Sequence, residues 1–506
     1  MRSDQTYDVV VLGGGPVGEN VAQYATEHSG LTAVLVEREL VGGECSYYAC
    51  MPSKALLRPI EVASTAAHLG GLSRPHLDVA ALLARRDEWV SHYDDASQVD
   101  WAEGAGIDVV RGHGRITGPR TVEVTRDGEG PVVLHARHAV VIATGSSPVV
   151  PEPYAAALPW GSRDATGVVE VPERLAIVGG GVVACEAATW MAALGSHVTM
   201  LVRGDRLLGG AEPFASEAVL EALRGAGVDV RLGVEVSRCR REDARDTGLG
   251  RVHGGMVHLL TTTSADTGAG APTGDQTSPA ADGEAGAGEV VEADELLVAT
   301  GRRPRLEGLG LETVGLDAQA LLRHTSSPSE SSRGEVPDWL LAVGDASGEA
   351  PLTHWGKYRA RVLGQHLAAR TTGAEPEPVP DDVPVPQVVF TDPQVAWVGL
   401  TASAARERFG ETEVEVVEVP FTGAAGAALL RDDASGTASL VVDRGSRTVV
   451  GATFVGPDAG ELLHAATIAI VGRVPVSVLR HAVPSYPTAS ELWLRLLEGL
   501  PRDLRR

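Results

Sequence analysis

The residues in this sequence best suited to chemistry are two cysteines, Cys45 and Cys50, with four residues between them. A thiolate attacks disulfide sulfurs, and two neighbouring thiols can open and close a disulfide. The alternatives are a metal site or two unpaired core cysteines. A metal site needs further ligands, and neither a second cysteine pair nor a histidine cluster follows. The spacing therefore favours a redox role, and no metal site is expected.

A glycine-rich turn precedes the cysteine pair. An apolar strand, Tyr7–Leu12, runs into a turn with GxGxxG spacing and then into a helical pattern that ends near Glu27. Small residues in such a turn let the backbone approach a pyrophosphate at the positive end of the following helix. After a second apolar strand, Thr32–Val36, Glu37 can accept hydrogen bonds from a ribose diol. This segment predicts a dinucleotide-binding fold, and its turn glycines are Gly13, Gly15 and Gly18.

The same order of elements recurs later in the chain. The strand Leu175–Val178 leads into a second glycine-rich turn, a helix that ends near Leu194 and a strand over His197–Val202. Two further apolar strands, Val140–Gly145 and Leu296–Gly301, end in matching Ala-Thr-Gly turns, and each is expected to close one domain. The repeat predicts two dinucleotide-binding folds, each built on a parallel βαβ unit. The residues expected to contact the nucleotides are Thr144 and Gly145 in the first fold, and Gly179, Gly181 and Gly301 in the second.

The strand that ends at Val202 indicates which nicotinamide nucleotide the second fold takes. A fold selective for NAD usually places an acidic residue there, to hold the ribose 2′-hydroxyl. Here the position is apolar, and Arg203 and Arg206 follow. Guanidinium groups pair with a 2′-phosphate, which a carboxylate would repel. The pattern favours NADPH, with NADH the less favoured alternative; otherwise the two arginines are solvated residues of a surface turn.

Composition limits the classes of protein. A chain of 506 residues, 43% hydrophobic and 22% charged, is typical of a globular protein with roughly two to four domains. The formal net charge of −24 argues against a nucleic-acid partner. No apolar run is long enough for a membrane span, the N-terminus lacks a signal-peptide pattern, and four cysteines cannot form a secreted disulfide framework. We therefore expect a cytoplasmic protein without a membrane partner.

Three polar segments separate the regular elements. The stretch Thr261–Glu289 has almost no large apolar residue and is expected to be a flexible surface insertion. Ser326–Gly334 is expected to be a second loop, and the proline-rich, acidic Glu375–Pro386 a linker. Beyond the linker, alternating patterns and a helix from about Glu461 predict a final α+β domain, with strands over Val414–Val419, Ala438–Val442 and Val449–Val455.

The run GGECSYYACMPSK, from Gly42 to Lys54, resembles the flavoprotein pyridine nucleotide–disulfide oxidoreductases, a family that includes glutathione reductase, dihydrolipoamide dehydrogenase and mercuric reductase. The resemblance covers nearly the whole chain. It implies that Cys45 is the outer, interchange cysteine and that Cys50 touches the flavin of a bound FAD. It also implies that Lys54 lies near flavin N5 with Glu186 as its ion-pair partner, which would favour negative charge on the reduced flavin.

Two later segments extend the resemblance. Leu341–Ala346 resembles the second FAD signature of the family, which implies that Gly344 binds FAD and that Asp345 accepts hydrogen bonds from its ribityl chain. The Ala-x-x-Glu-Gly that usually follows is replaced by His354–Tyr358, so the flavin's pyrimidine edge is expected to be contacted differently. Phe390–Thr401 resembles the start of the dimerisation domain. The family builds its active site across that interface, which implies a homodimer.

The C-terminal segment departs from the family pattern. Disulfide reductases carry His-Pro-x-x-x-x-Glu there, and the histidine shuttles protons to the substrate thiol. Glu491 stands where expected, but Tyr486 takes the histidine position. Tyrosine titrates at about pH 10, so it is a poor general base at neutral pH, although it can donate a hydrogen bond. His481, five residues earlier, could substitute for the histidine or be structural.

The remaining cysteines, Cys185 and Cys239, are interpreted as ordinary residues of the second dinucleotide domain. No cysteine follows them, so the C-terminal cysteine pair of mercuric reductase and the similar tail of large thioredoxin reductases are not expected. Activity of either of these two types is therefore not expected.

Together these patterns predict an α/β fold with two doubly wound Rossmann-like dinucleotide-binding domains and a C-terminal α+β dimerisation domain. The domains are expected at residues 1–155 (FAD, first part), 156–300 (NAD(P)H), 301–378 (FAD, second part) and 379–506 (interface). Electrons are expected to pass from NADPH through FAD to the Cys45–Cys50 disulfide and on to a small-molecule disulfide, or in reverse. Given Tyr486, one alternative is a reductase of a quinone, metal ion or other acceptor. Another is a docking subunit of a multienzyme complex, similar to dihydrolipoamide dehydrogenase.

Overall fold

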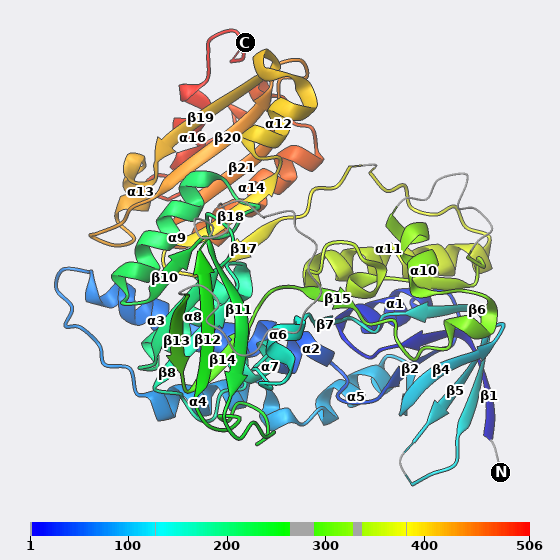
Figure 1. The fold of residues 1–506 in the computed structure, drawn as a ribbon. Helices are drawn as coiled ribbons and strands as arrows, with labels where there is room; N and C mark the ends of the chain where they lie inside the picture. Colours follow the sequence, from blue (N-terminus) through cyan, green and yellow to red (C-terminus); the bar gives the residue numbers. More distant parts are fainter. Residues whose placement is uncertain (1–2, 127, 264–287, 327–335, 381, 506) are drawn as a thin grey trace, which may run out of the picture. The chain divides into compact units, whose positions relative to one another are not determined.

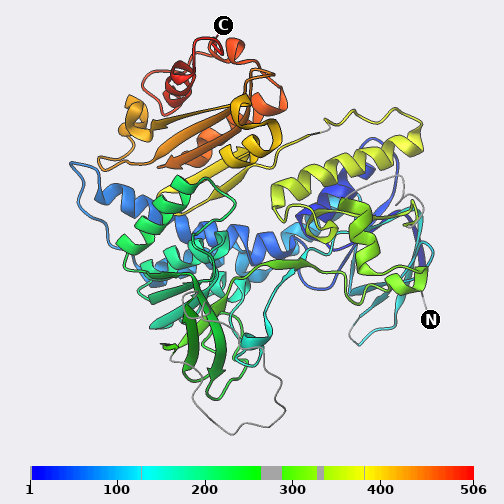
Figure 2. The same cartoon turned by 45° about the horizontal axis from the view of Figure 1, so that its top comes forward.

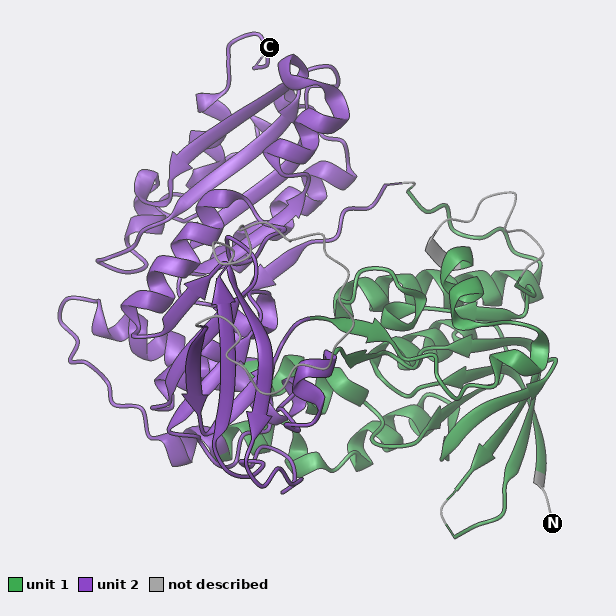
Figure 3. Ribbon diagram, in the orientation of Figure 1, with its two compact units in different colours: residues 1–53, 84–149, 301–381 green, residues 54–83, 150–300, 382–506 purple. Residues whose placement is uncertain are grey.

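The chain folds into two compact units, which Figure 3 shows in different colours. Unit 1 contains residues 1–53, 84–149 and 301–381, and unit 2 contains residues 54–83, 150–300 and 382–506. The computed structural model describes residues 3–126, 128–263, 288–326, 336–380 and 382–505. Helix α3 (Cys50–Ala67) begins in unit 1 and continues into unit 2.

A seven-stranded sheet forms the centre of unit 1 (Figure 1). Its parallel part has the order β3-β2-β1-β6, and β16 pairs with the C-terminal end of β6, while antiparallel β5 and β4 extend from its N-terminal end. Residues Val9–Val11 are fully buried, as in strands of parallel sheets covered on both faces. The strands are β1 (Ser3–Leu12), β2 (Ala33–Glu37), β3 (Ile107–Arg111), β4 (His113–Gly118), β5 (Thr121–Thr125), β6 (Val132–Ile142) and β16 (Leu340–Ala342).

Two helices of unit 1, α1 (Pro16–Thr26) and α11 (Thr353–Thr372), pack against each other, as the views of Figure 1 and Figure 2 agree. A Cβ atom at Gly356 would lie 2.6 Å from the Val17 side chain, and one at Gly364 would lie 2.7 Å from Tyr24 Cβ. These glycines therefore permit the close approach. The other helices are α2 (Gly43–Tyr47), α4 (Val79–Trp89, which begins in unit 2), α5 (Ala96–Gly104) and α10 (Ala318–Ser326), with short 3₁₀ turns at Leu311–Val314 and Gly344–Ser347 and a left-handed turn at Ser91–Tyr93.

Unit 2 contains a second nucleotide-type sheet with the parallel order β10-β9-β8-β14, which repeats the order β3-β2-β1-β6 of unit 1. A three-stranded antiparallel sheet, β11-β12-β13, accompanies it. Helix α8 (Val182–Ala193) follows the second glycine turn, and α9 (Pro213–Gly225) precedes β10. The strands are β8 (Arg174–Val178), β9 (His197–Val202), β10 (Asp229–Leu232), β11 (Val234–Arg241), β12 (Val257–Thr263), β13 (Glu289–Ala293) and β14 (Glu295–Val298).

The C-terminal part of unit 2 is a five-stranded antiparallel sheet with helices α14 (Ala459–Val471) and α16 (Glu491–Gly499) packed on it. Its core joins buried residues of β20 and β21 to apolar residues of both helices. The strand order is β17 (Gln387–Val389), β18 (Gln394–Gly399), β21 (Thr448–Gly456), β20 (Thr437–Asp443) and β19 (Val414–Pro420). Shorter helices are α6 (Glu152–Ala155), α7 (Ser162–Thr166), α12 (Ala402–Phe409), α13 (Ala425–Ala428) and α15 (Val476–Leu479).

The α/β class and the two nucleotide-type folds predicted from the sequence are confirmed, because strand, glycine turn, helix and strand follow one another in both units. Thr261 and Glu289, the predicted ends of the surface insertion, pair with each other in the hairpin of β12 and β13. Residues 264–287 of that insertion, and 327–335 of the second predicted loop, lie outside the described residues. Within the predicted linker, residues 375–380 and 382–386 contain neither helix nor strand.

Candidate functional site

The first glycine turn of unit 1 has room for a pyrophosphate because side chains are absent from it. Gly13 has a φ of 108°, and a Cβ there would lie 2.3 Å from the Ala143 carbonyl oxygen. A Cβ at Gly18 would lie 1.9 Å from the Gly13 carbonyl oxygen. Gly15 caps α1 in an extended conformation, and Pro16 opens the helix. The turn can therefore present the first N–H groups of α1 to an anion.

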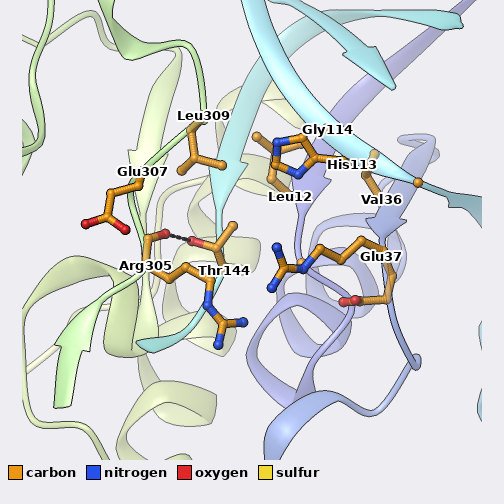
Figure 4. A pocket seen from close by; sticks show the side chains of 12 residues that line it. Leu12, Val36, Glu37, His113, Gly114, Thr144, Arg305, Glu307 and Leu309 are labelled. Carbon is orange, nitrogen blue, oxygen red and sulfur yellow. Dashed lines mark hydrogen bonds between the residues drawn. The ribbon is translucent and has the colours of Figure 1, made fainter. Parts of the chain in front are cut away.

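A pocket lies beside this turn, and Figure 4 shows Glu37 on one side of it and Thr144 and Arg305 on the other. The Glu37 carboxylate at the end of β2 accepts hydrogen bonds from the backbone N–H groups of Gly14 and Glu39, both at 2.7 Å. Thr144 Oγ1 donates to the Arg305 carbonyl oxygen at 2.6 Å. The carboxylate is thus held in place, where it can accept hydrogen bonds from a ribose diol.

The predicted second FAD segment joins a polar network in unit 1. Asp345 accepts a hydrogen bond from Ser146 Oγ at 2.5 Å. Arg302 Nε donates a hydrogen bond to Ser146 Oγ at 2.8 Å, and the Arg302 guanidinium lies 3.3 Å from the Glu44 carboxylate. The antiparallel pair β7 (Ser146–Pro148) and β15 (Arg302–Pro304) brings these side chains together. Sequence reasoning missed Ser146, Arg302 and Glu44, although they directly follow Gly145 and Gly301 and precede Cys45.

Both cysteines of the pair are thiols in this structure. Cys45 lies in α2 and Cys50 opens α3, and the Cys45 side chain is hydrogen-bonded to Cys50. The pKa of Cys45 is raised, first by this hydrogen bond and then by burial, while Thr353 and Lys357 act in the opposite direction. Thr353 Oγ1, at the start of α11, lies 3.3 Å from Cys50 Sγ. The positive end of that helix favours a thiolate at Cys50.

Lys54 and Glu186, 132 residues apart in sequence, form an ion pair in unit 2 with Nζ and Oε2 at 2.8 Å. The Glu186 side chain, on α8, is only 5% exposed, and its other oxygen accepts a hydrogen bond from the Phe390 backbone N–H at 3.0 Å. The Lys54 ammonium also lies 4.7 Å from the centre of the Phe390 ring. The buried carboxylate therefore fixes the ammonium, which stands four residues after Cys50 in α3.

The second glycine turn repeats the geometry of the first. Gly179 has a φ of 129°, and a Cβ there would lie 2.4 Å from the Ala299 carbonyl oxygen. Gly181 is the N-cap of α8, with open space where its Cβ would stand. Beyond β9, Arg203 and Arg206 are exposed. Gly301 lies in unit 1, where its carbonyl oxygen accepts a hydrogen bond from the Val149 N–H.

The C-terminal segment with the altered motif lies in unit 2. Tyr486 is 77% exposed, and His481 is also exposed. Glu491, the first residue of α16, is 6% exposed, and its Oε2 has no hydrogen-bond partner among the described residues. A buried carboxylate oxygen without a donor is costly. Among the described residues, no hydrogen bond links Tyr486 to Glu491.

No group of three or more His, Cys, Asp or Glu side chains among the described residues could hold a metal ion. None of the helices in the described ranges combines the length and hydropathy that crossing a membrane requires.

The fold and the site define a class: an oxidoreductase with two dinucleotide-binding folds and a thiol pair. Residues 7–322 match the family model for pyridine nucleotide-disulphide oxidoreductase, and residues 385–496 match its dimerisation domain. Dihydrolipoyl dehydrogenase of Haloferax volcanii is 31% identical over 97% of this chain and 96% of its own length. Glutathione reductase of Burkholderia cepacia is 30% identical over 97% of this chain and 98% of its own length.

A solved structure gives the same fold. The Cu(II) complex of RclA, an HOCl-induced flavoprotein disulfide reductase of Escherichia coli, superposes with a TM-score of 0.76 at 22% identity, covering 98% of this chain and all of the other. This chain belongs to the pyridine nucleotide-disulphide oxidoreductase family and is an NAD(P)H-dependent flavoprotein oxidoreductase. The family implies FAD and a pyridine nucleotide, and its dimerisation domain indicates a homodimer.

The residues present fit FAD. Gly13 and Gly18 leave a cradle that any side chain would fill, and Glu37 offers a fixed carboxylate beside it. Asp345 and Ser146 add a polar group from another segment of the same unit. When bound, FAD supplies hydride acceptance and electron transfer.

Proposed function

We propose that this enzyme passes electrons from NADPH through FAD to the Cys45–Cys50 disulfide and on to a small-molecule disulfide, or runs in reverse to oxidise a dithiol. The observation that carries the proposal is the hydrogen-bonded Cys45–Cys50 pair with Thr353 against Cys50. Following the family resemblance, Cys50 meets the flavin and Cys45 meets the substrate. The same resemblance implies that the Lys54 ammonium, which Glu186 holds, favours negative charge on the reduced flavin.

The exchange with a disulfide substrate balances in two displacements. The Cys45 thiolate attacks one substrate sulfur, and the first substrate thiol leaves with a proton. Cys50 then attacks Cys45 in the mixed disulfide, re-forms the Cys45–Cys50 bond and releases the second thiol. The two electrons that reduce the substrate come from the protein dithiol. The first displacement requires that Cys45 lose its proton.

A second candidate function is the reduction of a quinone, metal ion or other acceptor. The raised pKa of Cys45 means that attack on a disulfide needs a proton acceptor. Tyr486, in the histidine position, is a poor one at neutral pH. An acceptor that takes electrons without thiol exchange would not need that base, and this mismatch favours the second candidate.

An anaerobic titration with NADPH, followed by a panel of disulfides, quinones and metal ions, separates the two candidates. Under the first proposal, Cys45→Ser abolishes turnover of the best acceptor, and Cys50→Ser removes the charge-transfer absorbance of a thiolate beside the flavin. Cys239→Ser is the matched control and should leave both signals unchanged. If Cys45→Ser keeps full turnover, the disulfide route is wrong and the second candidate stands.

The choice of NADPH rests on Arg203 and Arg206, which are exposed beyond buried Val202 where an NAD-selective fold carries a carboxylate. Arg203→Glu should lower the ratio of kcat/KM for NADPH to that for NADH by about 10-fold or more, because charge-assisted hydrogen bonds contribute roughly 1.5–3 kcal/mol. Arg238→Glu, in β11, controls for a general change of charge. An unchanged ratio in Arg203→Glu would show that Arg203 is only a surface residue.

The proposed assembly is a homodimer through the interface domain at residues 379–506, in the cytoplasm, where reduced thiols persist. Large apolar side chains are exposed on this domain: Ile468, Val478 and Val483 are 57%, 56% and 89% exposed. Such exposure is typical of a surface that a second subunit covers. Val483→Asp should shift the mass measured by light scattering towards the monomer, and an unchanged dimer would remove this residue from the interface.

A further inference from the structure

Residues 91–93 of unit 1 form a left-handed turn between α4 and α5. Ser91, His92 and Tyr93 have φ angles of 49°, 50° and 62°. This region is unfavourable for residues that carry a Cβ, and it is usually visited by single residues. The Tyr93 N–H donates to the Val90 carbonyl oxygen at 2.8 Å, which closes the turn. Backbone strain of this kind persists only where surrounding contacts over-determine the conformation.

The contact that the turn makes is an aromatic stack. The rings of Tyr93 and Tyr48 have centroids 5.5 Å apart and planes inclined by 27°. Tyr48 is the C-cap of α2 and lies between Cys45 and Cys50 in the sequence. The ring of Tyr47 is 6.4 Å from that of Tyr48 and is almost fully buried. Both aromatic residues between the cysteines, Tyr47 at the end of α2 and Tyr48 as its C-cap, are therefore held by packing, and Tyr93 supplies part of that packing from another segment.

Asp95, two residues after the turn, contacts the chain just before the two cysteines. The Asp95 carboxylate accepts hydrogen bonds from the Val41 backbone N–H at 2.6 Å and from Arg111 at 2.5 Å. Arg111 also donates to the Glu39 carbonyl oxygen at 2.7 Å. The segment 91–95 thus contacts the chain just before Gly42 and again inside the loop between the two cysteines. A free loop at either place would let the sulfurs separate when the disulfide opens.

We propose that Tyr93 is a positioning residue for the Cys45–Cys50 pair: it holds Tyr48 so that the open dithiol keeps both sulfurs ready to close again. The proposal rests on the redox role given to the pair above. Closing a disulfide reduces the conformational entropy of the segment between the two cysteines. A segment that is already held in place loses less conformational entropy when the disulfide closes. The stack therefore stabilises the disulfide relative to the dithiol. It does not touch substrate, and it acts through Tyr48.

Equilibration of the FAD-loaded enzyme with defined ratios of reduced to oxidised dithiothreitol measures this balance. The protein disulfide and reduced dithiothreitol exchange two electrons and two protons to give the protein dithiol and cyclic oxidised dithiothreitol. Alkylation followed by mass measurement counts the thiols at Cys45 and Cys50. Tyr93→Leu should raise the equilibrium constant for reduction about 2- to 10-fold, the range that an aromatic pair's contribution spans. Tyr93→Phe keeps the ring and should behave as the unmodified enzyme.

Two further variants separate positioning from general stability. Tyr48→Leu should shift the equilibrium as Tyr93→Leu does, and the double variant should shift it no further, because both remove one contact. Tyr24→Leu removes a ring of the same unit from α1, where the Tyr24 Cβ lies close to Gly364, and it should leave the equilibrium unchanged. Equal shifts in Tyr24→Leu and Tyr93→Leu, or no shift in Tyr93→Leu, overturn the proposal. If the unmodified pair never forms a disulfide at any ratio, the proposed function fails first, which is a different outcome.

Discussion

Glu19 is a buried acid whose replacement has a calculable effect. It lies in the first turn of α1, is 9% exposed, and its Oε1 has no hydrogen-bond partner among the described residues. Burial raises the pKa of Glu19 from 4.5 to about 7, against the attraction of Lys357 and with a smaller repulsion from Glu37. At about 1.4 kcal/mol per pKa unit, this difference corresponds to about 3 kcal/mol between the folded and unfolded states.

The direction in which stability changes with pH follows from proton binding to Glu19. Between pH 4.5 and about 7 the folded state keeps the proton on Glu19 while the unfolded state has released it, so stability falls as pH rises through this window. Glutamine resembles the protonated acid and does not titrate. Glu19→Gln should therefore be more stable than the unmodified enzyme by about 3 kcal/mol at about pH 8, with little difference at about pH 4.5.

Urea unfolding at a series of pH values tests this prediction, with the rise of flavin fluorescence on release as the signal for unit 1. This local signal is needed because a chain of two units does not unfold in one two-state step. Glu27→Gln, an exposed residue just beyond the same helix, is the control and should show no pH-dependent difference. A Glu19→Gln variant that is less stable at pH 8, or whose advantage is independent of pH, would refute the reasoning.

Three more predictions concern one ion pair and two single residues. Arg241 and Glu295 form an ion pair in which both side chains are 0% exposed. Arg241→Met should therefore destabilise unit 2 by about 3–5 kcal/mol in urea unfolding, and the double variant with Glu295→Leu should recover most of that loss. An equal loss of stability in the double variant would contradict this prediction. Lys54→Met should slow flavin reduction by NADPH at least ~10-fold in stopped flow while Lys54→Arg retains most of the rate, because the charge assists the step; equal rates in both would remove the charge from the mechanism. Tyr486→His should raise turnover of glutathione disulfide or lipoamide ~10²-fold if a missing base limits exchange, and an unchanged rate would locate the limit elsewhere.

Local spacing was enough to predict the two nucleotide-type folds. The glycines at 13, 15 and 18 follow an apolar strand and open a helix, and this strand–turn–helix pattern depends only on residues close in sequence. The cysteine spacing likewise predicted a redox pair, and the structure places Cys45 in α2 and Cys50 at the start of α3. In contrast, Lys54 and Glu186 were paired only by resemblance, because nothing in their spacing of 132 residues brings an ammonium to a carboxylate.

Some parts of the site gave no sequence signal at all. The left-handed turn at Ser91–Tyr93 contains no glycine, so residue types alone would not predict its backbone. The network of Glu44, Ser146 and Arg302 was overlooked because its members are ordinary polar residues until two distant strands pair. The pKa of Glu19 could not be predicted either, since an acid in the first turn of a helix is usually solvated and favourable there.

The sequence by itself determined the fold class, the order of elements and the presence of a thiol pair, because these depend on hydrophobic periodicity and on short-range backbone geometry. Only the tertiary structure decided which polar groups meet. Thr353 reaches Cys50 across 303 residues, and Tyr93 reaches Tyr48 through a strained turn. Burial and electrostatic interactions depend on what surrounds a group in space, and for these residues the surroundings come from segments far away along the chain.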